Sequence, residues 1–484
     1  MICITVTPKS RTLAKADLLN AARQGDIIEL CLDHFHKEPD VKDLITAVDK
    51  PLIVSCRRPV DGGMWQGTEE ERLMLLRQAI VASPDYVELD LDVAPNVPRF
   101  GKTQRVISFT RLDRPESDID SIFSEAMQAK ADVVKFCWPT PTLNAAWPLL
   151  AAVSQKRMLP VVGMGLGRAE LTFSLLGRKF GSPWIYAALE KGMEAHPGQA
   201  TVFELNDIYD LRSINPKTVF VAVTGFGEAQ TRTVRILNAA FQEANLNVRC
   251  LPVEFGDIQP VKKMLEALKI RAVVVHGRTG ASLAEWGISV SQEDAATGYL
   301  DLLLNKSEGW QGFNFLGKAA LKGLSDHLQT SGGDLARMNV LVIGNGGMAQ
   351  TLTRALVRKN GMVSVCGPDD KDARRVASDV GCRFVPYQNL YETLMDAVIV
   401  ADPKVEPGTG HKQVNPSLLR PGMLFLDISN LPVETTMLSE ARDRGCHVVD
   451  STKIFADQVA AQYQAISGKP LSESALARGL SDEP

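Results

Sequence analysis

The residues Ala131-Asp132-Val133-Val134-Lys135-Phe136-Cys137 form an apolar run with one lysine inside it. The run follows a helical pattern and comes shortly before a proline, which predicts a buried strand of a parallel sheet. An ammonium group is costly to desolvate there, and burial lowers the pKa of a lysine. We therefore expect Lys135 to become a neutral amine that can attack a ketone. The alternative is a lysine that reaches solvent or pairs with Glu29 or Glu88.

Similar strand-like runs recur through residues 1–212, with helical patterns in most of the gaps. The two clearest helical patterns, Glu69–Ala82 and Ser117–Lys130, open with acidic residues that suit a helix N-terminus. Such strand-then-helix units are typical of a (β/α)₈ barrel. The strand-like runs centre near Ile4, Glu29, Val54, Glu88, Ile107, Lys135, Val161 and Tyr186.

Charged side chains near the ends of these strands predict where chemistry occurs. In a (β/α)₈ barrel the active site lies at the C-terminal ends of the strands. Glu29, Arg57, Glu88 and Lys135 all fall at or near such ends. An arginine binds anions and a buried lysine forms imines with ketones, so their convergence predicts an anion-binding, imine-forming site.

Composition restricts the class of protein. The chain has 484 residues, enough for two domains, and a formal net charge of −4, which gives no basic field for a nucleic acid. No apolar run reaches the ~18 residues of a membrane span, and MICITV is too short for a signal peptide. The eight cysteines form no C-x-x-C pair, as in a reducing compartment. We expect a cytoplasmic protein with no metal site, no nucleic-acid partner and no membrane partner.

A second signature follows a polar, proline-containing joint at residues 211–217. Strand Asn339–Ile343 leads into Gly344-Asn345-Gly346-Gly347-Met348-Ala349, then helix Gln350–Arg358 and strand Met362–Cys366. A G-x-G-x-x-A loop between strand and helix lets a pyrophosphate approach the helix N-terminus. It predicts a Rossmann domain whose dinucleotide contacts Gly344, Gly346, Gly347, Met348 and Ala349. A purely structural turn is the alternative.

The identity of the dinucleotide depends on the end of the second Rossmann strand. An acid there favours the free 2′-hydroxyl of NAD, and an arginine favours the 2′-phosphate of NADP. Asp369 and Asp370 come a little late, while Lys371, Arg374 and Arg375 lie on the following helix. Both cofactors therefore stay open.

Further motifs in both halves point to one family. In the first half they are Glu29, Arg57, Asp61-Gly62-Gly63, Glu88, Lys135, Gly177, Phe180-Gly181-Ser182 and Pro197-Gly198-Gln199. In the second half they are the glycine loop, Asp427, Pro432-Val433-Glu434-Thr435, Leu438, Gln458 and Gln462-Tyr463. In this order they resemble the fused type I 3-dehydroquinate dehydratase and shikimate dehydrogenase family over nearly the whole chain. The resemblance implies a dehydratase barrel at 1–212, a substrate-binding domain at 217–325 and an NAD(P)-binding Rossmann domain at 326–484, whose C-terminal helices return to the substrate domain.

The resemblance also implies a mechanism for the barrel. Lys135 would form an imine with the C3 ketone of 3-dehydroquinate, and the imine would acidify the C2 proton so that water leaves from C1. Arg57 would clamp the substrate carboxylate or a hydroxyl. Glu29 and Glu88 would orient neighbouring groups, and Gln199 would close over the ring. The product, 3-dehydroshikimate, would be reduced in the second half with NADP, or with NAD.

The barrel departs from the family at several positions. The place of the general-base histidine is held by Thr110, which cannot shuttle a proton near pH 7. Two arginines are replaced by Cys31 and Ser174, and a serine of the covering loop by Ala195. His196 lies in that loop, and our hypothesis is that it supplies the missing acid–base function. A solvated loop histidine is the alternative.

The dehydrogenase half departs further. Thr231 and Thr233 replace two serines that hold the substrate carboxylate, and Gln458 is a further substrate-binding candidate. Arg278 takes the place of the catalytic lysine and Leu316 that of its partner aspartate. Gly367 replaces the arginine that grips a 2′-phosphate. Loss of a Lys/Asp proton relay is usually worth about 10²–10⁴-fold in rate.

Two interpretations follow. In the first, the chain is a bifunctional enzyme of the shikimate pathway, a lyase and an oxidoreductase, and forms a homodimer as such barrels often do. In the second, it is a divergent member that has lost or changed one or both activities. It would then bind shikimate-like acids or run a different imine-forming lyase reaction.

Overall fold

The computed structural model describes residues 1–225, 227–276, 288–295, 299–403, 405, 407–408 and 413–481. The chain divides into two compact units. The first comprises residues 1–220 and 245–265, and the second comprises residues 221–244 and 266–484.

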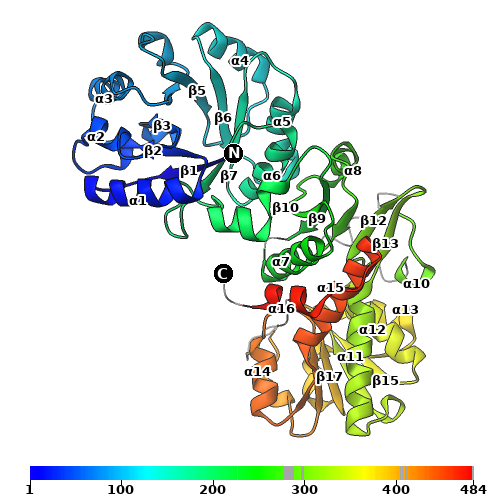
Figure 1. Ribbon diagram of the computed structural model, residues 1–484. Helices are drawn as coiled ribbons and strands as arrows, with labels where there is room; N and C mark the ends of the chain where they lie inside the picture. The colour runs from blue at the N-terminus through cyan, green and yellow to red at the C-terminus, as the bar shows by residue number, and fades with distance from the viewer. Residues whose placement is uncertain are drawn as a thin grey trace. The chain divides into compact units, whose positions relative to one another are not determined.

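Parallel strands form the centre of the first unit, in a nearly closed barrel (Figure 1). Their order is β7-β6-β5-β4-β3-β2-β1-β8, so each strand lies beside its neighbour in sequence and β8 returns to β1. Every predicted strand centre falls within one of these strands, which confirms the barrel. The strands are β1 (Ile2–Val6), β2 (Ile27–Cys31), β3 (Leu52–Ser55), β4 (Tyr86–Asp90), β5 (Gln104–Thr110), β6 (Val133–Pro139), β7 (Val161–Leu166) and β8 (Ile185–Ala188).

Helices fill the gaps between the strands. The two helices predicted from sequence are confirmed as α3 (Glu69–Val81) and α4 (Ile119–Gln128). Thr68 and Glu71 form a capping box at the start of α3. Asp118 caps α4 and Asp120 lies in its first turn, so both acids stand at the helix N-terminus as expected, although α4 begins at Ile119. The remaining barrel helices are α1 (Arg11–Gln24), α2 (Val41–Ile45), α5 (Leu143–Ser154) and α6 (Glu170–Phe180).

The alternation of side chains along a strand places the charged residues inside the barrel. Ile27 and Val133 belong to an apolar cluster in the barrel interior. Glu29 and Lys135 come two residues later on the same strands, so they face the same interior one layer nearer the C-terminal ends. This layer holds buried charged side chains of the barrel strands, among them Glu29 and Lys135.

The second unit contains two sheets. Strands β9 (Val219–Thr224), β11 (Ala272–Val274), β12 (Leu302–Lys306) and β13 (Gly309–Phe313) lie side by side in that order. Helix α7 (Glu228–Glu243) follows β9, and the short α10 (Gln292–Ala295) precedes β12. Strand β10 (Val248–Val253) groups with the barrel unit, where it packs against α6, and α8 (Ile258–Ala267) follows it.

The other sheet is parallel and confirms the Rossmann domain. Its order is β16-β15-β14-β17-β18-β19, with helices on both faces. Strands β14 and β15 have the predicted bounds, whereas α12 begins earlier than predicted because Gly346 is its N-cap. The strands are β14 (Asn339–Ile343), β15 (Met362–Cys366), β16 (Arg383–Phe384), β17 (Ala397–Val400), β18 (Leu424–Asp427) and β19 (His447–Val448). The helices are α11 (Phe315–Ser331), α12 (Gly347–Arg358), α13 (Asp370–Val380), α14 (Thr436–Asp443), α15 (Ser451–Ser467) and α16 (Glu473–Leu480).

The last two helices pack against helix α7 of the second unit. The Tyr463 hydroxyl of α15 donates a hydrogen bond of 3.2 Å to the Ala240 carbonyl of α7, and α16 packs along α7. Within the described residues, no helix is long and apolar enough to cross a membrane.

Candidate active sites

Lys135 lies at the centre of the barrel with 1% of its surface exposed. Its Nζ donates to Glu88 Oε2 at 2.8 Å and lies 3.9 Å from Glu29 Oε1. The same Nζ is 4.5 Å from the centre of the Tyr186 ring. The lysine is therefore both buried, as predicted, and paired, as the alternative held.

The expected lowering of the Lys135 pKa is wrong for the protein without substrate. Burial acts to lower this pKa, but the charges of Glu88 and Glu29 outweigh burial and raise it above its ordinary value. The position of Lys135 in an apolar run reveals only the cost of burying a cation. Two buried carboxylates change the sign, so Lys135 is an ammonium until its proton is removed.

Arg57 and Glu29 form an ion pair beside Lys135. Arg57 Nη2 donates to Glu29 Oε1 at 3.1 Å and to Cys31 Sγ at 3.3 Å. Burial acts to raise the pKa of Glu29, but Arg57 and Lys135 outweigh it and lower that pKa to about 2. The buried Nε of Arg57 has no hydrogen-bond partner in the described part of the chain, so a donor is left for an anion.

The segment 195–199, here called the covering segment, is tied to the barrel by Gln199. The Gln199 amide donates to Thr5 Oγ1 at 3.2 Å, and its Oε1 accepts from the Ala195 backbone N–H at 2.8 Å. Gly198 has φ +90°, and a Cβ there would lie 2.5 Å from the Gly167 carbonyl oxygen. Only glycine fits this turn, so the covering segment is held close to the loop after β7.

His196 of the covering segment is enclosed. Its Nδ1 lies 3.3 Å from Glu170 Oε2, and its side chain is 13% exposed. Burial, together with the charges of Arg57 and Lys135, lowers the pKa of His196 to about 4. The alternative of a solvated loop histidine is therefore wrong, and the imidazole lies within the electrostatic reach of the lysine.

Thr110, which stands in the place of the family's general-base histidine, lies on β5 opposite Cys137 of β6.

In the second unit the predicted carboxylate-binding threonines lie on α7. Thr233 is fully buried, and its Oγ1 lies 3.1 Å from His276 Nε2. Thr231 is exposed and its hydroxyl donates to the Gly227 carbonyl at 3.2 Å. Burial lowers the pKa of His276 to about 4. Arg278 lies outside the described residues.

Gln458 of α15 reaches a buried carboxylate that precedes β12. The Asp301 carboxylate accepts from the Gln458 amide at 3.0 Å, and from the backbone N–H groups of Phe315 at 2.9 Å and Leu316 at 2.5 Å. Burial raises the pKa of Asp301 to about 6, although these hydrogen bonds act to lower it. The Asp301 carbonyl also accepts from the Val275 N–H at 2.9 Å, next to His276. Hydrogen bonds thus join Thr233 to His276 and Gln458 to Asp301, and the backbone bond of Val275 brings the two pairs together.

The glycine loop fits a pyrophosphate. Gly344 has φ +145°, and a Cβ there would meet the backbone of Ala401 at 3.2 Å. Gly346 is the N-cap of α12 and no side chain caps that helix, so its first N–H groups are left for an anion. Gly347 is the first helical residue, and Met348 and Ala349 are buried beneath the turn. No metal-binding group of three or more His, Cys, Asp or Glu occurs in the described ranges.

With this geometry the relationship of the chain can be stated. Residues 2–216 match the family of type I 3-dehydroquinases, and residues 326–451 match the family of shikimate/quinate 5-dehydrogenases. The chain is a fused member of these two families.

One relative is named for both families, and another matches the barrel alone. The chain is 23% identical over 500 residues to a bifunctional 3-dehydroquinate dehydratase/shikimate dehydrogenase, chloroplastic, of Arabidopsis thaliana, covering 97% of this chain and 82% of the relative. It is 27% identical over 223 residues to a 3-dehydroquinate dehydratase of Methanocaldococcus jannaschii, covering 44% of this chain and 100% of the relative. The solved structure of dehydroquinate dehydratase and shikimate dehydrogenase from S. pombe is 18% identical, with a TM-score of 0.44, and covers 99% of this chain and 98% of that one.

Two buried acids of this family member escaped the sequence analysis. Glu170 opens an apolar helix, where an acid usually just favours the helix N-terminus. Asp301 precedes an apolar strand and resembles an ordinary strand boundary. Their partners His196 and Gln458 were both singled out from sequence, but nothing in the sequence shows which acid meets which partner.

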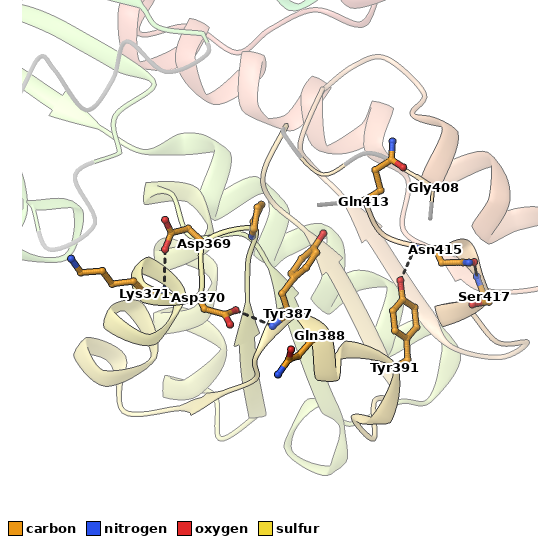
Figure 2. A pocket seen from close by; sticks show the side chains of 11 residues that line it. Asp369, Asp370, Lys371, Tyr387, Gln388, Tyr391, Gly408, Gln413, Asn415 and Ser417 are labelled. Atoms are coloured by element: carbon orange, nitrogen blue, oxygen red, sulfur yellow. Dashed lines mark hydrogen bonds between the residues drawn. The ribbon is translucent and has the colours of Figure 1, made fainter. Parts of the chain in front are cut away.

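A cavity of ≈ 800 Å³ lies beside β15, where the ribose of a Rossmann cofactor is expected. Figure 2 shows Asp369, Asp370 and Lys371 on one side of it and Asn415 with Ser417 on the other. Asp369 Oδ1 caps α13 by accepting from the Lys371 N–H at 2.9 Å. Asp370 Oδ1 accepts from the Tyr387 N–H at 2.9 Å, so each acid keeps one oxygen outside these bonds.

Proposed function

We propose that the chain is a bifunctional shikimate-pathway enzyme. Its barrel dehydrates 3-dehydroquinate to 3-dehydroshikimate through an imine at Lys135, and its second unit reduces 3-dehydroshikimate to shikimate with a nicotinamide cofactor. The observation that carries the proposal is Lys135, buried inside the barrel between Glu88 and Glu29 with Arg57 alongside.

In the barrel, the first task is to free the amine. Glu88 Oε2 lies 2.8 Å from Lys135 Nζ and is placed to accept its proton. The neutral amine then attacks the C3 carbonyl, and loss of water gives the imine. Arg57 holds the carboxylate or a hydroxyl of the substrate, and Gln199 holds the covering segment closed above it.

The second task is to move a proton from C2 to the hydroxyl that leaves C1. Thr110 cannot do so, since a threonine does not ionise near neutral pH. His196 is the enclosed imidazole on which the charges of Lys135 and Arg57 act, which supports it as the acid–base group. It would take the C2 proton and return it to the departing hydroxide as water. Hydrolysis of the product imine would release Lys135.

In the second unit, Thr231, Thr233 and Gln458 are the proposed substrate ligands, and Arg278 is proposed to contact the reacting end. Thr233 and Gln458 are held by His276 and Asp301. A bound nicotinamide supplies the hydride. The free N–H groups of α12 at Gly346 and Gly347 would hold its pyrophosphate.

Between NADP and NAD, the residues around β15 favour NAD. Gly367 stands where an arginine would hold a 2′-phosphate, and the acids Asp369 and Asp370 line the cavity there. A carboxylate accepts hydrogen bonds from a free 2′-hydroxyl and repels a phosphate. Lys371 is the cation that opposes this preference.

Compartment and assembly stay predictions. All eight cysteines are free thiols in the structure, which supports a reducing compartment such as the cytoplasm. A homodimer is implied by family resemblance.

The test is to incubate the protein with 3-dehydroquinate and either NADH or NADPH, and to follow enone absorbance and cofactor oxidation separately. Enone formation with cofactor oxidation supports both activities. Enone alone supports the dehydratase and contradicts the reductase. If neither signal appears in folded protein, the bifunctional proposal is wrong and the chain binds shikimate-like acids or runs another imine reaction.

A further inference from the structure

Glu170 is a buried acid that the proposed mechanism does not yet use. It is the first residue of α6 and only 2% exposed. Burial, with a smaller effect of Glu204, raises the pKa of Glu170 well above its ordinary value. In the part of the chain that the structure describes, His196 is the one basic group within ion-pair distance of it. A carboxyl group kept in such a site without lysine or arginine needs a reason.

The two side chains meet with a defined polarity. Glu170 Oε2 lies 3.3 Å from His196 Nδ1, on the side of the ring away from Nε2. His196 Nδ1, His196 Nε2 and Glu170 Oε2 are all buried, and none of the three has a hydrogen-bond partner within the described residues. The charged groups that act on the imidazole are Arg57, Lys135 and Glu29, all inside the barrel. Nδ1 is therefore at ion-pair distance from the Glu170 carboxyl group without a hydrogen bond to it, and Nε2 is the second nitrogen left for a ligand.

We propose that Glu170 is the positioning residue of His196 in the dehydration. Once ionised, the Glu170 carboxyl group accepts from Nδ1–H, which fixes the tautomer whose Nε2 carries a lone pair. Because burial raises the pKa of Glu170, this ionised form is favoured as the pH rises. Nε2 takes the C2 proton, and the Glu170 carboxylate stabilises the imidazolium that forms. Nε2 then gives the same proton to the hydroxide leaving C1, so water departs and the dyad returns to its starting state. This inference rests on the proposed function of the barrel.

Glu170 and His196 lie on different elements from Thr110, which holds the family's acid–base position. Thr110 lies on β5, whereas Glu170 and His196 come from α6 and the loop after β8. The dyad would thus approach the imine from a different part of the barrel rim. That change requires a support for the imidazole that does not come from β5, and Glu170 provides it.

The experiment compares Glu170→Gln with wild type in the full chain. We expect kcat for enone formation to fall about 10–100-fold with little change in KM, and the pH dependence of kcat to move to lower pH because the imidazolium loses its counter-charge. Borohydride trapping of substrate on Lys135 should stay at the wild-type level, since the imine forms without the dyad. Glu125→Gln, an exposed acid on α4, is the matched control.

A double variant separates an effect of Glu170 that acts through His196 from an effect that is independent of His196. If Glu170 acts through His196, Glu170→Gln in a His196→Ala background costs nothing further. Wild-type kcat and pH dependence in Glu170→Gln, or a full additive loss in the double variant, would overturn the inference. Failure of wild type to be trapped on Lys135 would instead overturn the proposed function. Should Glu170→Gln not fold, Glu170→Asp replaces it, with lowered kcat and an unmoved pH dependence as the expected result.

Discussion

Lys135 Nζ and Glu88 Oε2 lie 2.8 Å apart inside the barrel, and both side chains are buried. The pair holds the lysine as an ammonium and also supplies the group that can remove its proton. In the proposed mechanism, imine formation therefore depends on a proton transfer over this one hydrogen bond. The cost of burying a cation alone does not account for it.

Glu88→Gln should lower the pKa of Lys135. Removing the closest negative charge leaves burial less opposed, so we expect the pKa of Lys135 to shift downward. The midpoint of the pH dependence of borohydride trapping measures it. Glu29→Gln is the comparison, because Glu29 lies 3.9 Å from Nζ and should produce a smaller shift. Equal midpoints in wild type and Glu88→Gln would contradict the assigned pair.

Thr5→Val should loosen the covering segment. The Thr5 hydroxyl accepts the Gln199 amide at 3.2 Å, and valine keeps the shape of the side chain while removing that acceptor. A lost neutral hydrogen bond is worth about 1 kcal/mol, so KM for 3-dehydroquinate should rise about fivefold with kcat nearly unchanged. Gln199→Ala removes the bond to Ala195 as well and should raise KM further. Thr7→Val, two residues along the chain from Thr5, is the control for a threonine-to-valine change. An unchanged KM in Thr5→Val would contradict the role of Thr5 in holding the covering segment.

His196 should make the barrel sensitive to acid. Its folded pKa is about 4, below the ordinary value of 6.5, so its contribution to stability is present above pH 6.5 and is lost as the pH falls through 4. The full effect is roughly 3 kcal/mol. In His196→Asn, which cannot protonate, the urea midpoint should fall less than in wild type between pH 7 and pH 4. Parallel losses in both proteins would show that the imidazole is not buried as described.

Gly367→Arg should shift cofactor preference toward NADP. A Cβ at Gly367 would lie 3.4 Å from the nearest atoms of Asn345, an ordinary contact, so the side chain can be accommodated. A guanidinium there would pair with a 2′-phosphate, and we expect the NADP/NAD ratio of kcat/KM to rise at least about tenfold. Wild type should favour NAD. A wild type that strongly prefers NADP would contradict the proposed role of Asp369 and Asp370.

The barrel could be predicted from sequence because its strands are short apolar runs at regular spacing. Each of the runs centred on Ile4, Glu29 and Val54 became a strand, since no competing pattern existed in those segments. The Rossmann strands Asn339–Ile343 and Met362–Cys366 were found for the same reason. Helix ends were less certain, as at α4, where a capping aspartate sets the boundary.

The site was predictable only in part. Lys135, Glu29 and Glu88 could be placed together because strand ends of a barrel converge. The direction of the Lys135 pKa shift could not be predicted, because it depends on the 2.8 Å distance between Nζ and Glu88 Oε2, which the sequence does not contain. The pairs Glu170–His196 and Asp301–Gln458 each join segments brought together by folding alone. Such pairs become visible only with coordinates.

The most direct test is to add borohydride to the protein in the presence of 3-dehydroquinate and to locate the label by peptide mass spectrometry. We expect one covalent adduct on Lys135, absent in Lys135→Met and still formed in His196→Ala. No adduct in folded wild-type protein, or an adduct on another lysine, would contradict the central claim that this barrel works through an imine at Lys135.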